Sequence, residues 1–144
     1  MDFDLSNCIG FVTNTTTKAV TEDFNRRLEK CGSTRIQWIA LYFLLKADQS
    51  MSQKELAALM NIQDSSLARL IDRMERDGLL RRIENPNDRR MKFLELTEAG
   101  RLKADALMPH GQDFSNLLLE NITDEEVEVF YRVLDKLLKN IKNK

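Results

Sequence analysis

The sequence predicts a mainly α-helical protein with one small β-hairpin, an α+β fold class. The 144 residues are 42% hydrophobic and include only 5 Gly and 2 Pro, which suits one compact domain over residues 1–144. Apolar residues recur at steps of three and four over most of the chain, as in amphipathic helices. Between residues 79 and 96 this period changes to two, as in strands.

The first predicted helix runs from Asp4 to Lys30. Gly32 ends it, because glycine readily takes the left-handed conformation found after helix ends. The apolar side chains at helical spacing include Leu5, Ile9, Val12, Ala19 and Val20.

A second helix is predicted after Thr34, which has capping-box spacing to Gln37. Residues 48–50, Asp-Gln-Ser, are expected to end it. Its predicted buried stripe consists of Ile36, Ile39, Ala40, Phe43 and Leu44.

Two short helices follow. Ser52 and Glu55 have capping-box spacing for the first of them, and Asp64 is expected to cap the second, which Gly78 ends. The connection at residues 61–64 is brief, so the pair matches a helix-turn-helix. The predicted inward residues are Leu56, Ala57, Leu59 and Met60 in the first helix, and Leu67, Leu70, Ile71 and Met74 in the second.

A β-hairpin is predicted directly after the helix-turn-helix. Residues 79–84 and 92–96 alternate in polarity, and residues 85–88, Asn-Pro-Asn-Asp, have the composition of a turn. A hairpin in this position is a wing, so the fold is predicted to be a winged helix-turn-helix.

Two further helices complete the chain. One begins near Thr97 and runs toward Asn121, with an interruption and a kink expected at residues 109–111, Pro-His-Gly. The other begins at a capping box formed by Thr123 and Glu126. Its apolar residues are Val127, Phe130, Tyr131, Leu134, Leu137, Leu138 and Ile141.

Charge is unevenly distributed along the chain. The totals nearly cancel, with 22 basic and 23 acidic residues, but residues 69–92 hold 8 basic and 5 acidic side chains. Because charges are screened beyond about 10 Å, a local basic surface on an acidic protein can still bind a polyanion.

The second helix of the helix-turn-helix and the wing carry the predicted nucleic-acid contacts. A helix enters the DNA major groove with its N-terminal part toward the base edges, and wing arginines reach a minor groove or flanking phosphates. A solvated charged helix face and an exposed charged turn are the alternatives for these residues. The candidates are Gln63, Ser65, Ser66, Arg69 and Arg73 on the helix, and Asp88, Arg89, Arg90 and Lys92 on the wing.

A series of short motifs runs through the chain in a fixed order. Its residues are Thr34, Gln37 and Trp38, residues 53–57, residues 66–75, Gly78, Leu79 and Arg82, residues 85–90, and Leu94, Leu96, Thr97 and Gly100. In the order and spacing of these motifs, the chain resembles the MarR family of bacterial winged helix-turn-helix regulators over essentially its whole length. The resemblance implies a homodimer on a palindromic DNA operator, with Arg90 in the minor groove and Asp88 pairing to hold it. It implies a DNA-binding lobe at residues 33–100 and a dimerisation region at residues 1–32 and 101–144.

Dimerisation also follows from the apolar pattern of the first and last helices. A chain of this length has little else to cover their side chains, and an exposed patch of that size is an association site. Packing of the two helices on each other within one chain is the alternative.

Resemblance to the family also implies release from DNA by a small aromatic or anionic effector, which would make the protein a repressor. The candidate ligand-binding residues are Phe11, Thr15 and Lys18 in the first helix, and Arg35 and Trp38 in the second; core or interface packing is the alternative for Phe11 and Trp38. Some family members sense oxidants through a cysteine in the first helix, so Cys8 is a redox candidate, with an inert thiol as the alternative.

Several classes of function are not supported by the sequence. One His and two Cys residues are too few for common metal sites, and no phosphate loop or nucleophile–base pair indicates an enzyme. No cofactor, metal or membrane partner is therefore expected, and the acidic N-terminus is unlike a signal peptide, so a cytoplasmic location is predicted. A protein–protein interaction module is the remaining alternative, although its docking helix would expose apolar anchors rather than arginines.

Overall fold

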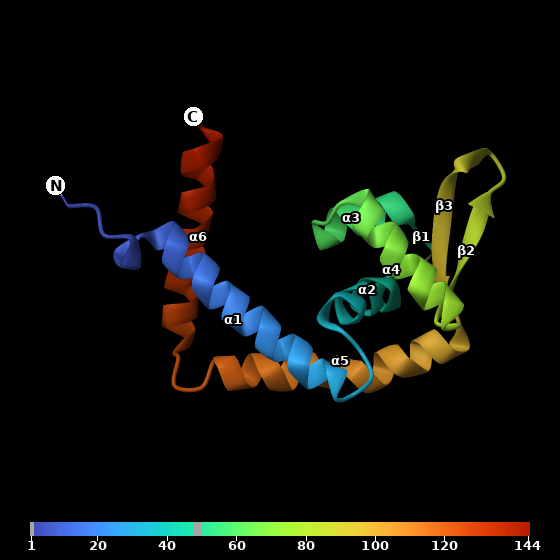
Figure 1. Ribbon diagram of the computed structural model, residues 1–144, viewed down its shortest axis with the longest axis horizontal. Helices are drawn as coiled ribbons and strands as arrows, with labels where there is room; N and C mark the ends of the chain where they lie inside the picture. Colours follow the sequence, from blue (N-terminus) through green and yellow to red (C-terminus); the bar gives the residue numbers. More distant parts are fainter. Residues whose placement is uncertain (1, 48–49) are drawn as a thin grey trace. The chain divides into compact units, whose positions relative to one another are not determined.

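The computed structural model describes residues 2–47 and 50–144. By its internal packing the chain divides into two units, Met1–His110 and Gly111–Lys144. The elements, labelled in Figure 1, are a 3-10 turn η1 (Leu5–Asn7), α1 (Ile9–Glu29), α2 (Arg35–Lys46), β1 (Met51–Ser52), α3 (Gln53–Met60), α4 (Asp64–Arg76), β2 (Leu80–Asn85), β3 (Asp88–Leu96), α5 (Glu98–Leu118) and α6 (Asp124–Lys142).

Helix α1 begins later than the sequence predicts, at Ile9 rather than at Asp4. The Asp4 carboxylate accepts hydrogen bonds from the backbone and the hydroxyl of Ser6 and from the amide of Asn7. These bonds stabilise the turn η1, after which Cys8 is extended and occupies the N-cap position of α1. Side-chain bonds of this kind compete with helix formation. At the other end, Gly32 has a φ of +79°, as expected.

The core of the first unit lies where α2, α3, α4 and the sheet pack together (Figure 1). Helix α4 buries Leu67, Leu70, Ile71 and Met74, which confirms the predicted inner face. Other elements of this unit contribute further buried residues; they include Leu28, Ala40, Leu41, Leu44, Leu56, Ala57, Leu80, Leu94, Leu96 and Ala104.

Two of the predicted apolar stripes differ from the structure. Leu59 is 52% exposed on α3, although the sequence predicts it to be inward. In α2 the fully buried residue Leu41 is missing from the predicted stripe, while Ile36, Ile39 and Phe43 are only half-buried. Helix α2 ends at Lys46; the predicted breaking residues Asp48 and Gln49 lie outside the described part of the chain.

The helix N-termini are capped largely as the spacing predicts. Thr34 and Ser52 each accept a hydrogen bond from the backbone three residues on, at 3.2 and 3.0 Å. Within the described residues only Thr123 and Glu126 form the complete reciprocal capping box. The expectation that Asp64 caps α4 is wrong: Gln63 holds the N-cap position without a side-chain bond, and Asp64 is the first helical residue.

The predicted hairpin is confirmed, and it belongs to a three-stranded antiparallel sheet of order β1-β3-β2. Leu80 faces Leu96 and Ile83 faces Phe93, with an irregularity between Glu84 and Asn85 near the turn. Strand β1 has only two residues, too few to show a period in the sequence.

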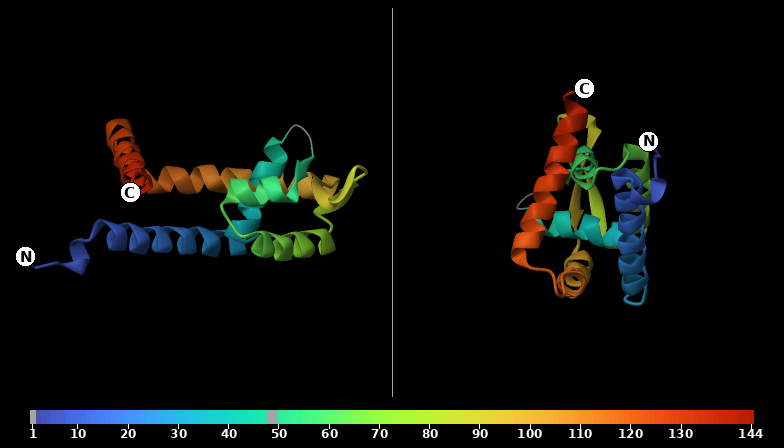
Figure 2. Two further views of the ribbon diagram at one scale, coloured as in Figure 1. Left: turned by 90° about the horizontal axis from the view of Figure 1, so that it is seen from above. Right: turned by 90° about the vertical axis from the view of Figure 1, so that its left-hand side faces the viewer.

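Helix α5 continues through Pro109, so the predicted interruption at residues 109–111 is wrong (Figure 2). A proline removes one helical hydrogen bond, and the surrounding turns can hold the helix together. In the preceding turns Ala104 and Leu107 are buried, and the Trp38 indole donates a 2.8 Å hydrogen bond to the Leu107 carbonyl.

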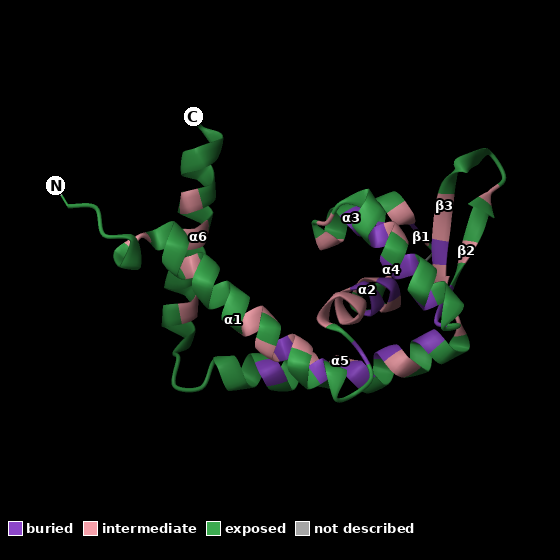
Figure 3. Cartoon of the chain, in the orientation of Figure 1, coloured by how far each residue is buried: buried purple, intermediate pink, exposed green. Residues whose placement is uncertain are grey.

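Helix α6 has no buried residue, and Figure 3 shows it almost wholly exposed. Its apolar residues Phe130, Tyr131, Leu138 and Ile141 are between 52% and 71% exposed. Among the described helices none is long and apolar enough to cross a membrane.

Candidate nucleic-acid interface

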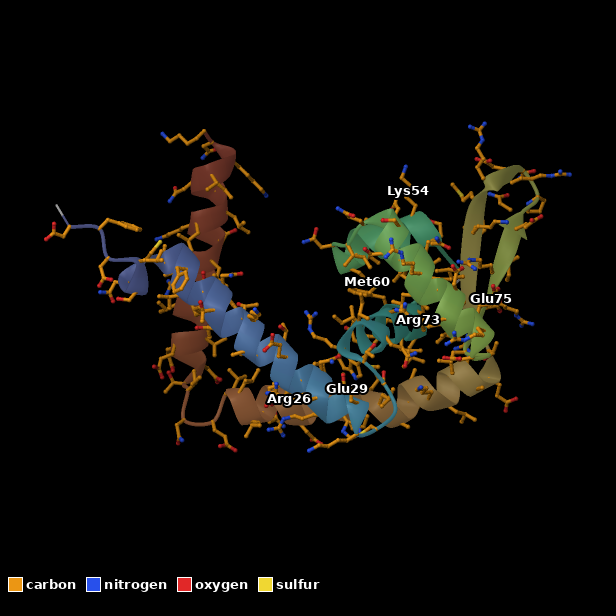
Figure 4. All side chains as sticks on the ribbon, in the orientation of Figure 1. Arg26, Glu29, Lys54, Met60, Arg73 and Glu75 are labelled. Atoms are coloured by element: carbon orange, nitrogen blue, oxygen red, sulfur yellow. The ribbon has the colours of Figure 1, made fainter. Side chains whose placement is uncertain are left out.

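Helix α4 exposes the polar face that the sequence predicts. Its apolar residues face the core, so Ser65, Ser66, Arg69 and Arg73 lie on the exposed side, as does Gln63 at the N-cap. Figure 4 labels Arg73 on this helix. Ser and Gln side chains and arginine guanidinium groups can bond both base edges and phosphates. The exposed face of α4 therefore has the chemistry that major-groove binding needs.

The tip of the hairpin presents Arg90 on an ordered turn. Oδ1 of Asp88 accepts the backbone N–H of Arg90 at 3.0 Å and lies 3.9 Å from Nε of the same residue. The Arg90 side chain is nevertheless 98% exposed. Asp88 thus fixes the backbone that carries Arg90 while the guanidinium group extends into solvent. Arg89 beside it is also exposed, and Lys92 pairs with Glu84 at 3.2 Å.

The structure also reveals an ion-pair network at the base of the wing, centred on Arg82 of β2. Its guanidinium group contacts Asp72 at 2.6 Å and Glu75 at 3.2 Å on α4, and Nε donates to Gln53 of α3 at 3.3 Å. It also donates to the Ala68 carbonyl at 3.4 Å, and its backbone N–H donates to Glu75 at 3.0 Å. One side chain therefore joins the wing to both helices of the helix-turn-helix; Figure 4 labels Glu75 between α4 and the hairpin.

Sequence reasoning did not assign this role to Arg82. The alternation of residues 79–84 places Arg82 on a strand but does not identify its partners. The available signal was on α4, where Asp72 and Glu75 lie three residues apart and so share one side of the helix. Two carboxylates on one side of a helix in a basic segment indicate an arginine partner.

Replacing Arg82 with methionine is expected to lower the free energy of unfolding by about 2 kcal/mol, because several charge-assisted bonds of a side chain only 22% exposed are lost. Arg81→Met is the matched control. The Arg81 side chain is 65% exposed, and its ion pair with Glu95 is long at 4.0 Å, so its loss should cost little stability. Urea denaturation of both variants measures the difference. Equal stability of the two variants would show that the network contributes nothing.

The candidate ligand-binding residues are not all brought together. Arg35 lines a crevice of about 380 Å³ between α1 and α2 with Thr21, Glu22, Asn25, Arg26 and Ile36. Trp38 is not among the lining residues; it packs edge-on against Phe24 and stacks on Tyr42. Phe11, Thr15 and Lys18 are exposed further toward the start of α1 and do not line the crevice either.

Both cysteines are free thiols. Cys8 is half-buried at the N-cap of α1, and Cys31 is exposed in the turn after this helix. No group of three or more His, Cys, Asp or Glu residues that could hold a metal ion occurs in the described ranges.

An exposed arginine-bearing helix beside an arginine-tipped hairpin defines a winged-helix DNA-binding fold, the class used by many transcription regulators. The family model that matches residues 32–91 is that of the MarR family. The matched segment runs from the turn before α2 into β3, and the solved structures below share the fold of this chain.

Three solved structures illustrate the similarity. AbsC, a MarR family transcriptional regulator from Streptomyces coelicolor, matches with a TM-score of 0.86 and 22% identity over 100% of this chain and 99% of its own. A mutant of MarR from E. coli, complexed with operator DNA, matches with a TM-score of 0.80 and 25% sequence identity. The match covers 90% of this chain and 93% of the MarR chain. CouR from Rhodococcus jostii RHA1, bound to p-coumaroyl-CoA, matches with a TM-score of 0.80 and 24% sequence identity. The match covers 94% of this chain and 95% of the CouR chain.

Proposed function

We propose that the protein is a homodimeric, sequence-specific DNA-binding regulator, acting as a repressor in the cytoplasm. The observation that carries this proposal is the pairing of the exposed α4 face with the Arg90 wing tip ordered by Asp88. Helix α4 inserts in the major groove with Gln63, Ser65 and Ser66 toward the bases. The MarR relative in complex with operator DNA supports the same use of the fold.

The proposed DNA-binding lobe comprises residues 33–100, and residues 1–32 and 101–144 form the dimerisation region. Two features support this division. No charged residue occurs from Leu5 to Thr17, although Ile9 and Phe11 in this stretch are 56% and 47% exposed. The apolar residues of α6 are exposed as well. Surfaces of this kind are covered in a stable protein, and a second copy supplies the cover.

A small aromatic or anionic effector is proposed to release the DNA. In the crevice between α1 and α2, Arg26 and Arg35 contribute two guanidinium groups, and Arg35 is anchored by a 2.7 Å bond from its backbone N–H to Asn25. Guanidinium groups bind carboxylates in a bidentate manner. The CouR structure, with p-coumaroyl-CoA bound, supports ligand binding by this fold.

Replacing Arg90 with alanine is expected to weaken DNA binding by about 1–3 kcal/mol, because a wing arginine is lost from each half-site. Fluorescence anisotropy on a duplex recovered from a random library measures the effect at physiological salt. Wild-type affinity should also fall steeply with salt, because phosphate neutralisation releases counterions.

Arg101→Ala is the matched control, since Arg101 is an exposed arginine on α5, outside the proposed interface. It should bind the duplex like the wild type. Unchanged affinity of the Arg90→Ala variant would remove the wing from the mechanism. A wild-type affinity that does not vary with salt would argue against DNA binding altogether.

A further inference from the structure

A groove lies between the first turns of α3 and α4 and the outer half of β3. It has a volume of about 380 Å³. Gln53 and Lys54 line it from α3, Asp64 from α4, and Asp88, Arg90 and Lys92 from the hairpin. Only Arg90, Lys92 and Asp88 among these are predicted DNA contacts, so the α3 wall of the groove has no assigned role.

The groove carries unused hydrogen-bond donors on its α3 wall. Lys92 is paired with Glu84, and Arg90 lies 3.9 Å from Asp88. Lys54, by contrast, which Figure 4 labels, is exposed. It forms no ion pair with any residue in the described ranges. Gln53 accepts a bond from Arg82 through its side-chain oxygen, which leaves the NH₂ group of the amide as a donor. Two adjacent side chains thus offer donors to an anion.

The position of the groove identifies the anion. This step rests on the proposed function, in which α4 occupies the major groove and the wing tip the neighbouring minor groove. One sugar–phosphate strand separates the two DNA grooves, so this strand must pass between α4 and the wing. The protein groove lies between these same elements.

We propose that the groove binds backbone phosphates of this strand, with Lys54 and Gln53 as the phosphate ligands. Lys54 then contributes affinity and salt dependence but no sequence preference, because phosphates carry no base information. Arg82 orients the Gln53 amide for this contact through its 3.3 Å bond.

The carboxylate of Asp64 makes the proposal testable by a gain of affinity. Asp64 lines the groove and forms no ion pair within the described part of the chain. Its negative charge opposes a phosphate in the groove. Asparagine at this position removes the charge, keeps the side-chain shape and is tolerated in the first turn of a helix. Asp64→Asn should therefore bind DNA several-fold more tightly, a result that misfolding cannot produce.

The experiment compares Lys54→Met with Lys30→Met, a control that removes an exposed lysine at the end of α1. On a duplex recovered from a random library, Lys54→Met should bind on the order of tenfold more weakly. The slope of its plot of log K against log salt should be smaller in magnitude than that of the wild type, by about one for each subunit. Library selection should return an unchanged sequence, and Lys30→Met should match the wild type.

A set of duplexes, each with one uncharged methylphosphonate in place of a phosphate, locates the contact. At one position the methylphosphonate should weaken binding of the wild type but not of Lys54→Met. The contact between Lys54 and that phosphate is already absent from the variant, so neutralising the phosphate removes nothing further. Normal binding by Lys54→Met, or equal sensitivity of both proteins at every position, would overturn the groove assignment alone. A folded wild-type protein that binds no duplex would overturn both this assignment and the proposed function.

Discussion

Replacing Gly100 with alanine is expected to destabilise the protein by about 3 kcal/mol, near the upper end for overpacked sites. A Cβ atom at this position would lie 1.9 Å from the carbonyl oxygen of Leu79 and 3.2 Å from Cδ2 of Leu96. The first of these atoms belongs to the backbone, so a change of rotamer cannot relieve the overlap.

The Leu79 carbonyl cannot move freely, because it accepts the backbone N–H of Thr97 at 3.0 Å. The Thr97 hydroxyl in turn donates to the Gly78 carbonyl at 2.6 Å and accepts from the backbone N–H of Gly100 at 3.1 Å. These bonds tie the end of α4 to the start of α5. An added methyl group must break this arrangement or push the two helix ends apart.

Thermal denaturation at one protein concentration measures the loss, which should lower Tm by about 10 °C for a chain of this size. Gly10→Ala in α1 is the matched control, since a Cβ there would meet no atom within 4 Å. It should leave Tm unchanged or raise it slightly, because alanine favours the helix. Equal behaviour of the two variants would contradict the close approach of α5 to Leu79.

The double variant Phe130→Glu and Leu138→Glu is expected to abolish dimerisation and to weaken DNA binding by about 100-fold or more. These residues are 54% and 52% exposed on the apolar side of α6. Carboxylates there would have to be buried without partners in an interface between two copies. A monomer engages one half-site only and loses the avidity of the second.

Light scattering should give the wild type twice the chain mass of 16.7 kDa and the variant that mass alone. Lys136→Gln with Lys142→Gln is the control, because it makes the same change in net charge at lysines of α6 and leaves its apolar residues intact. A double glutamate variant that stays dimeric would place the subunit contact elsewhere. A monomeric wild type would contradict the dimer proposal.

The features that the sequence predicted best are those set by local pattern. The four buried residues of α4 follow from strong helical amphipathicity, and the hairpin follows from a clear change of period around an Asn-Pro-Asn-Asp turn. Gly32 and Gly78 have positive φ angles after the ends of α1 and α4, as expected from the ease with which glycine takes the left-handed conformation. The exposed face of α4 is then the complement of its buried face.

The features that the sequence did not predict depend on competition or on tertiary contacts. The bonds of Asp4 favour a separate turn over the first turn of α1, which apolar spacing cannot reveal. Pro109 lies within a continuous α5, against the usual effect of proline. The partners of Arg82 come from α3 and α4, and the groove beside Lys54 forms only when these helices pack against β3.

Selection of bound sequences from random duplex DNA tests the central claim most directly. Purified full-length protein at physiological salt should enrich a palindrome whose half-sites lie about one helical turn, ~34 Å, apart. This result would establish sequence-specific binding by two symmetry-related α4 helices. Failure of a folded dimer to enrich any sequence, or enrichment of a single site without a symmetric partner, would contradict the proposal of a dimeric operator-binding regulator.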